Sequence, residues 1–159
     1  MKFKSKFILS LVVAAMVSFD AVQADTTDVV VKENIIEAVQ NIDIVSLNVL
    51  LAEGADIDSL DEAGNTALIL ASRIGNPRMV KIILAHEPNI DQKNSKGYTA
   101  LMIASEQGQI HIVEKLLEKG ADRSLTNSDG LTAADLAVRF GQPEVAKLLS
   151  GASQGELTR

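Results

Sequence analysis

The 159-residue chain has no cysteine and no tryptophan, one tyrosine and two histidines. Without cysteine there is no disulfide, no thiolate nucleophile, no cysteine-ligated zinc and no cysteine for the lipid anchor of a bacterial lipoprotein. The histidines, His86 and His111, do not form an H-x-x-x-H or H-E-x-x-H motif. We therefore expect them at the surface, near opposite ends of neighbouring helices, where they share no metal ion.

Basic residues are in the minority, with 15 Lys and Arg against 21 Asp and Glu. The first 24 residues contain three Lys and one Asp, so residues 25–159 contain 12 basic and 20 acidic residues, a difference of −8. Nucleic acids and anionic membranes are bound by clustered Lys and Arg, which argues against both as partners. The acidic charge fits solubility alone or a partner with basic patches.

Catalytic motifs are absent as well. The carboxylate pairs Asp56 with Asp58 and Asp61 with Glu62 are predicted to lie on loops, where Asp commonly caps turns. No glycine-rich phosphate loop and no EF-hand calcium loop occurs. We therefore predict no catalytic residue, no metal site and no cofactor. The alternative is a hydrolytic or small-ligand-binding protein that uses the Asp-rich turn tips, which requires a pocket with several convergent polar side chains.

The first 24 residues have the layout of a secretory signal peptide. Three lysines precede an apolar run of eleven residues, 7–17, and small or apolar residues at Val22 and Ala24 suit a cleavage site. The run is shorter than the roughly 20 residues that span a bilayer. We expect cleavage after Ala24 and export to a bacterial periplasm, with no membrane insertion afterwards. An uncleaved anchor, a buried helix and eukaryotic secretion are the alternatives.

The chain does contain a repeat with a constant period. Gly64, Gly97 and Gly130 are equally spaced and mark three copies, which read DEAGNTALILASRIG, NSKGYTALMIASEQG and NSDGLTAADLAVRFG. A fixed period of roughly 20 to 50 residues is typical of a solenoid of stacked units.

Each copy contains the local signals of a turn and a helix. Asp or Asn opens a type I turn that Gly closes three residues later. A threonine then caps the first turn of a helix, at Thr66, Thr99 and Thr132. That helix has Leu or Ala and then Ala three residues apart on one face, and a Gly in the left-handed conformation ends it, at Gly75, Gly108 and Gly141.

A second helix with an apolar stripe follows in each copy. Its residues are Met79, Val80, Ile83 and Leu84, then Ile112, Val113, Leu116 and Leu117, then Val145, Ala146, Leu148 and Leu149. Glu87 stands where Gly54 and Gly120 close the equivalent helices. Counting back one period places Ala38 on the Ala71 position, which indicates a degraded first unit. We predict a domain over 25–150 with units at about 28–60, 61–93, 94–126 and 127–150, and a flexible tail at 151–159.

These motifs resemble those of ankyrin-repeat proteins. The G-x-T-A-L-x-x-A-x-x-x-G runs from Gly64 and Gly97 and the L-L-E-K-G-A-D run from Leu116 carry the resemblance. The family's usual Pro after Thr is Ala here, and its usual His is replaced by Ile69, Met102 and Asp135. The resemblance implies an all-α solenoid of about four helix–turn–helix units joined by β-turn tips, without the hydrogen bond of that His.

In this family the turn tips and the outward side of the first helix form the binding face. Residues at these positions differ from copy to copy here, while the packing residues hardly change. The candidate partner-binding residues are Arg73, Ile74, Lys96, Tyr98, Glu106, Gln107, Asp129, Leu131, Arg139 and Phe140. We expect the four apolar or aromatic ones to face solvent, where they would form contacts with a partner. Ile74 and Phe140 have a second interpretation, as packing residues against the next repeat.

The resemblance therefore implies a non-catalytic protein-binding module that is monomeric and has one protein partner. Two roles fit an exported protein of this kind: an immunity protein that neutralises a toxin, and an accessory factor of a periplasmic enzyme such as catalase. Self-association through the edges of the solenoid is a structural alternative.

Overall fold

Residues 35–151 are the part of the chain that the computed structural model describes. They form helices and loops, and two isolated antiparallel bridges, Leu60 with Thr66 and Thr126 with Thr132, are the only β-type pairing among them. The expectations for the signal peptide, residues 1–24, and for tail residues 152–159 lie outside the described residues. No helix within 35–151 has both the length and the apolar composition needed to cross a bilayer.

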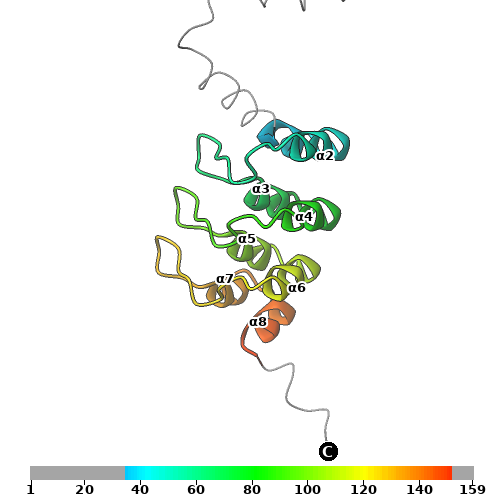
Figure 1. The fold of residues 1–159 in the computed structure, drawn as a ribbon. Helices are drawn as coiled ribbons and strands as arrows, with labels where there is room; N and C mark the ends of the chain where they lie inside the picture. Colours follow the sequence, from blue (N-terminus) through cyan, green and yellow to red (C-terminus); the bar gives the residue numbers. More distant parts are fainter. Residues whose placement is uncertain (1–34, 152–159) are drawn as a thin grey trace, which may run out of the picture.

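The helices pair in sequence order and stack in one row (Figure 1). A helix that includes residues 35–40 pairs with α2 (Ile44–Ala52), and α3 (Ala67–Ile74) pairs with α4 (Pro77–Leu84). Likewise α5 (Ala100–Glu106) pairs with α6 (Ile110–Glu118), and α7 (Ala133–Arg139) pairs with α8 (Pro143–Leu149). The predicted all-α solenoid is confirmed.

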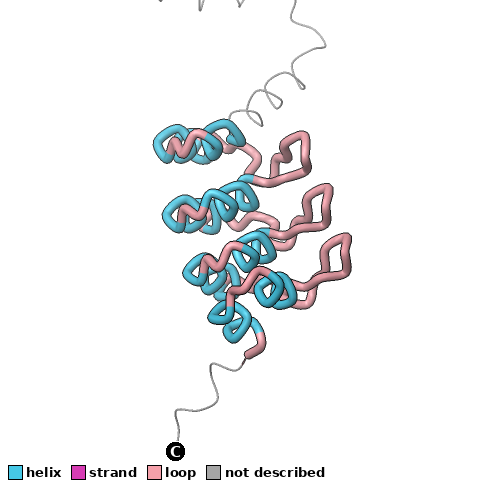
Figure 2. Tube along the Cα trace, turned by 180° about the vertical axis from the view of Figure 1, so that it is seen from behind, coloured by secondary structure: helices cyan, strands magenta, loops and turns pink. Residues whose placement is uncertain are grey.

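Three loops project from the same side of the stack, as Figures 1 and 2 show from opposite directions. We call residues 60–66, 93–99 and 126–132 the first, second and third finger. In each finger the glycine N–H donates to the carbonyl of the residue that opens the turn. These bonds are Gly64 to Asp61 at 2.9 Å, Gly97 to Asn94 at 2.8 Å and Gly130 to Asn127 at 3.0 Å. The turns predicted from the glycine spacing are therefore present.

Threonine caps start α3, α5 and α7, as the sequence predicts. The hydroxyls of Thr66, Thr99 and Thr132 accept from the third helical N–H at 3.2, 3.3 and 3.2 Å. In α7 the carboxylate of Asp135 also accepts from the hydroxyl and the N–H of Thr132, completing a capping box. These hydrogen bonds hold the pKa of Asp135 below its ordinary value of 3.8. The carboxylate half of the capping box therefore stabilises α7 above pH 3.8, and its contribution is lost as the pH falls through the lowered pKa.

Left-handed residues end the helices at the predicted positions, with φ of 76° at Gly75 and 70° at Gly108 and Gly141. Two residues other than glycine adopt the same backbone shape where the other repeats have glycine. Glu87 has φ 52°, and Ile42, which lies one repeat period before Gly75, has φ 58°. The repeat geometry thus persists where the glycine has been lost, although such a φ is strained for a β-branched side chain.

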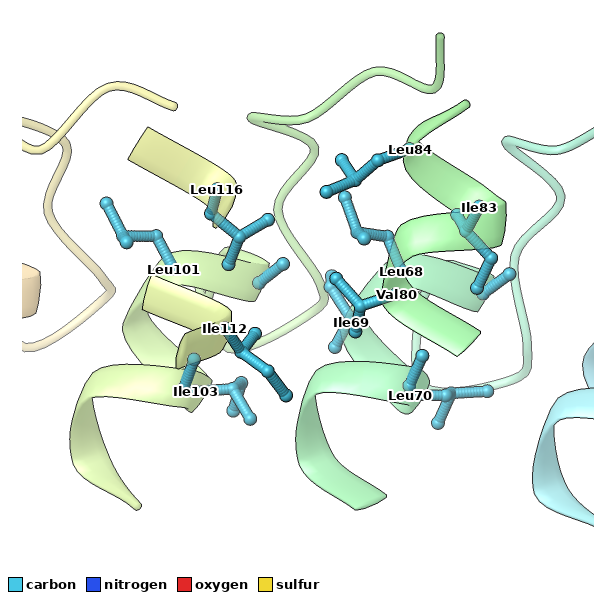
Figure 3. Close-up of a cluster of buried hydrophobic side chains, with 14 of the residues drawn as sticks. Leu68, Ile69, Leu70, Val80, Ile83, Leu84, Leu101, Ile103, Ile112 and Leu116 are labelled. Carbon is cyan, nitrogen blue, oxygen red and sulfur yellow. The ribbon is translucent and has the colours of Figure 1, made fainter. Parts of the chain in front are cut away.

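The core runs without interruption along the stack. Leu68, Leu101, Leu116 and Leu149 are 1, 1, 0 and 3% exposed and belong to one cluster of buried side chains. Figure 3 shows part of this cluster, with side chains of α3 and α4 on one side and of α5 and α6 on the other. These residues form a continuous apolar spine, which holds the fingers in line.

The fingers stack on one another through backbone contacts. The N–H of Ser95 donates to the carbonyl of Ala63 at 3.1 Å, and the N–H of Ser128 donates to the carbonyl of Lys96 at 3.2 Å. A Cβ added to Gly97 would lie 2.8 Å from the backbone nitrogen of Ser128. Gly130 has the same φ of 76° but no atom within 4 Å of an added Cβ, because no described finger follows it.

These two glycines allow backbone strain to be separated from finger stacking. We expect Gly130→Ala to lower the free energy of unfolding by about 1 kcal/mol, the cost of a left-handed alanine. Gly97→Ala should cost about 1–3 kcal/mol more, because its methyl group meets backbone of the next finger. Urea denaturation of both variants measures the difference. Equal losses would show that the fingers move apart freely.

Candidate protein-binding face

A groove of about 420 Å³ lies between the first two fingers and the C-terminal ends of α3 and α5. It brings together half of the predicted partner-binding residues, which are Arg73, Lys96, Tyr98, Glu106 and Gln107. They come from two successive repeats and so lie far apart in sequence. The constant period aligns them because it places equivalent residues of successive repeats side by side.

The floor of the groove is apolar and its rim is charged. Ile103 is 8% exposed, and the half-buried ring of Tyr98 packs against the core. Arg73 and Lys96 are exposed at the rim, and the carboxylate of Glu106 is half-exposed. No ion pair joins any of these charges to another residue within 35–151. The groove thus offers both apolar contact area and free charges of both signs.

One buried amide joins the walls of the groove. The Oδ1 of Asn65 accepts from Nη2 of Arg73 at 3.2 Å and from Nδ2 of Asn94 at 2.9 Å. Its Nδ2 donates to Oδ2 of Asp61 at 2.8 Å. Because Asn65 is only 2% exposed, these bonds are shielded from water and connect the first finger, α3 and the second finger.

The same network is not repeated at the next step of the solenoid. Tyr98 stands at the position of Asn65, and Glu106 stands at that of Arg73. The equivalent of Asn94 is Asn127, which is 6% exposed and whose Nδ2 has no hydrogen-bond partner within 35–151. Tyr98 has no amide oxygen to offer at this place, so the second and third fingers are joined with one polar contact fewer.

The other five predicted residues lie outside the lining of this groove. Ile74 is 39% exposed although another repeat follows it, which supports the first interpretation, a solvent-facing side chain; Phe140, in the last described repeat, is 49% exposed. Asp129 and Arg139 are exposed on the third finger and at the end of α7.

The expectation that Tyr98 and Leu131 face solvent is wrong in part. Both are half-buried and pack against the core cluster. Each directly precedes the threonine that caps a first helix, so its side chain is held against that helix at the base of the finger. A partner can therefore contact only the exposed edge of each side chain.

Sequence reasoning did not assign three residues that shape the groove. These are Asn65, Asn94 and Ile103, which line the groove beside the predicted residues. Ile103 could have been found, because it lies one helical turn before Glu106 on the same helix. The Asn65–Asn94 bond could not, since no local pattern announces a contact between side chains 29 residues apart.

Asp56 and Asp61 accept from turn N–H groups, as predicted, whereas Asp58 accepts from a loop of the next repeat. Asp56 accepts from the N–H of Asp58 at 3.0 Å, and Asp58 accepts from the N–H of Asn89 at 2.8 Å. Within the described part of the chain no group of three or more His, Asp or Glu could hold a metal ion. His111 is exposed and lies 3.4 Å from a carboxylate oxygen of Glu114.

The network around Asn65 can be tested by removing its central residue and one of its partners in separate variants. Asn65→Ala deletes three hydrogen bonds at a buried site, and we expect it to lower the free energy of unfolding by about 2–3 kcal/mol. Arg73→Ala removes only the exposed donor and should cost about 1 kcal/mol or less. Chemical denaturation of both variants provides the comparison. If the two losses are the same, the buried amide does not hold the fingers together.

Comparison with known proteins agrees with this geometry. Residues 35–127 match the family described as ankyrin repeats (3 copies). No curated protein gives a significant match. The helix pairs, the left-handed glycines and the projecting fingers are what the matched repeats predict, and α7 and α8 continue the same pattern beyond residue 127. Ankyrin repeats are typically non-catalytic modules for protein–protein interaction, and this chain belongs to the ankyrin-repeat family.

Proposed function

We propose that the chain is a monomeric, non-catalytic module that binds one protein partner through its fingers and the ends of its first helices. The observation that carries the proposal is the groove at Arg73, Lys96, Tyr98, Glu106 and Gln107. The groove combines an apolar floor with rim charges that form no ion pair within residues 35–151, and protein interfaces likewise have an apolar core and a polar rim. Ile74 and Phe140 extend the accessible apolar surface beyond it.

Variation between repeats supports the same interpretation. The pair of residues before the terminating glycine is Arg73 and Ile74 in one repeat, Glu106 and Gln107 in the next, then Arg139 and Phe140. The buried residues of α3 and α5 hardly differ. A surface that changes from repeat to repeat on a constant frame suits recognition of one partner of irregular shape and charge.

The proposed place of action is the bacterial periplasm, reached through the signal-like residues 1–24. Two roles are open there: neutralising a toxin as an immunity protein, and assisting a periplasmic enzyme such as a catalase. Both require a tight protein interface and no catalytic group. The alternative of a hydrolase or small-ligand protein loses support because the loop aspartates accept backbone hydrogen bonds, Asp56 and Asp61 within their own turns and Asp58 from Asn89 of the next repeat.

Substitutions on the exposed face should weaken partner binding without unfolding the protein. The face variant changes Lys96, Gln107 and Phe140 to alanine, and the control variant changes the exposed Arg78, Glu118 and Lys147 of the second helices to alanine. Each tagged chain is used to capture proteins from a periplasmic extract, followed by mass spectrometry. We expect the wild type and the control variant to recover the same protein and the face variant to lose it.

Thermal melting of the three chains keeps this result interpretable. The melts should differ little, because none of the changed side chains is buried. The proposal is wrong if the face variant is folded and still captures the same protein as the wild type.

Export can be tested independently of binding. After expression in a Gram-negative bacterium, we expect the chain in the periplasmic fraction, with Asp25 as its first residue by N-terminal sequencing. Recovery of the chain in the cytoplasm with residues 1–24 intact would remove the periplasmic part of the proposal and leave the binding part standing.

A further inference from the structure

The N-terminal end of the described stack exposes apolar side chains that a terminal repeat normally replaces with polar ones. Ile42, Val45 and Val49 are 50, 74 and 51% exposed. Val45 and Val49 lie one helical turn apart and so share one face of α2. α2 lies at the opposite end of the stack from α8 (Figure 1), and none of the residues that line the finger groove comes from α2.

A hollow of about 370 Å³ accompanies these side chains. It lies between the helix of residues 35–40 and α2. Its apolar lining comes from Ala38, Val45, Val49 and Leu50, and its carboxylates come from Glu37 and Asp43. Asp43 caps α2 and accepts from Val45 N–H, Ser46 N–H and the Ser46 hydroxyl. These bonds, chiefly those of Ser46, keep its pKa below the ordinary 3.8, so it is negative at neutral pH.

Charge is distributed unevenly along the solenoid, and the hollow lies at the acidic end. Residues 35–72 contain seven Asp and Glu and no Lys or Arg, whereas residues 73–151 contain nine acidic and ten basic residues. The acidic excess of the described chain is therefore confined to its first third. An apolar surface set in a field of one sign attracts a partner that is apolar and of the opposite sign.

We propose that this end of the solenoid docks a basic amphipathic segment of a partner protein. Such a segment places its apolar face against Val45 and Val49 and its Lys or Arg side chains next to Glu37 and the neighbouring carboxylates. The site is additional to the finger groove, and its test does not depend on that groove.

Two of the chain's own segments outside residues 35–151 have a composition that fits the surface less well. Residues 25–34 contain three valines, but they have three acidic residues and one lysine and so carry the same sign as the surface. Residues 152–159 contain one acidic and one basic residue and a single leucine. Residues 1–24 are basic and apolar, and the experiment includes them as a competing occupant.

The test measures binding of synthetic peptides to the full chain by fluorescence anisotropy. The probe is a helical peptide of about five turns with a leucine stripe and lysines on the opposite face. One control peptide replaces its lysines with glutamates, and another replaces its leucines with serines. We expect only the leucine–lysine peptide to bind, with affinity that falls as salt is raised.

Protein variants locate the site. Val45→Ser with Val49→Ser should weaken binding about tenfold or more, since each valine contributes apolar area. Val138→Ser, at a valine that is 69% exposed on α7 at the other end of the stack, is the matched control and should bind as the wild type does. Glu37→Lys should weaken binding and reduce its salt dependence. All these side chains are exposed, so the variants are expected to fold.

Several results would overturn the proposal. One is equal binding of the leucine–lysine and serine–lysine peptides, which would show that charge alone causes the binding. Another is equal binding of the leucine–lysine peptide by the Val45/Val49 variant and the Val138 variant. The proposal would also be overturned if the leucine–lysine peptide bound at least about tenfold more tightly after Val29–Val31 were changed to serine, or after Lys2, Lys4 and Lys6 were changed to glutamate. Either result would show that a segment of the chain itself occupies the surface.

Discussion

The close packing of each first helix on the first helix of the next repeat is the interaction on which the rest of the structure depends. Ala71, Ala104 and Ala137 are 0% exposed, and their small side chains let α3, α5 and α7 approach one another. The fingers emerge directly before these helices, so the spacing of the helices is also the spacing of the fingers. Any groove between fingers exists only because this packing is regular.

A stack held together by contacts between neighbours leaves a packing surface uncovered at each end. Ser72 and Ser105 are fully buried under the following repeat, whereas Val138, the equivalent residue of the last described repeat, is 69% exposed. At the other end Val45 and Val49 are exposed beside several carboxylates. The N-terminal end therefore differs from the rest of the solenoid. It is apolar and acidic, whereas acidic and basic residues nearly balance over residues 73–151.

The finger face shows how one frame supports both rigidity and variation. Between the first and second fingers, the buried amide of Asn65 links Asp61, Arg73 and Asn94. At the next step the aromatic ring of Tyr98 takes its place and leaves an amide of Asn127 without a partner among the described residues. The backbone turns are the same at both steps. Side-chain chemistry can therefore change at the groove while the glycine turns keep its shape.

The sequence alone determined the features that lie within a single repeat: the glycine turns, the threonine caps and the buried stripe. These features depend on residues a few positions apart, whose spacing can be read directly from the amino-acid sequence. Contacts between repeats were decided only by the tertiary structure. Only the tertiary structure shows that Tyr98 and Leu131 are half-buried and that Asn94 donates a hydrogen bond to Asn65. It also shows that Ile42 has a positive φ and that Val45 is exposed. The reason is that these outcomes depend on which side chains of neighbouring repeats meet, and on where the stack ends.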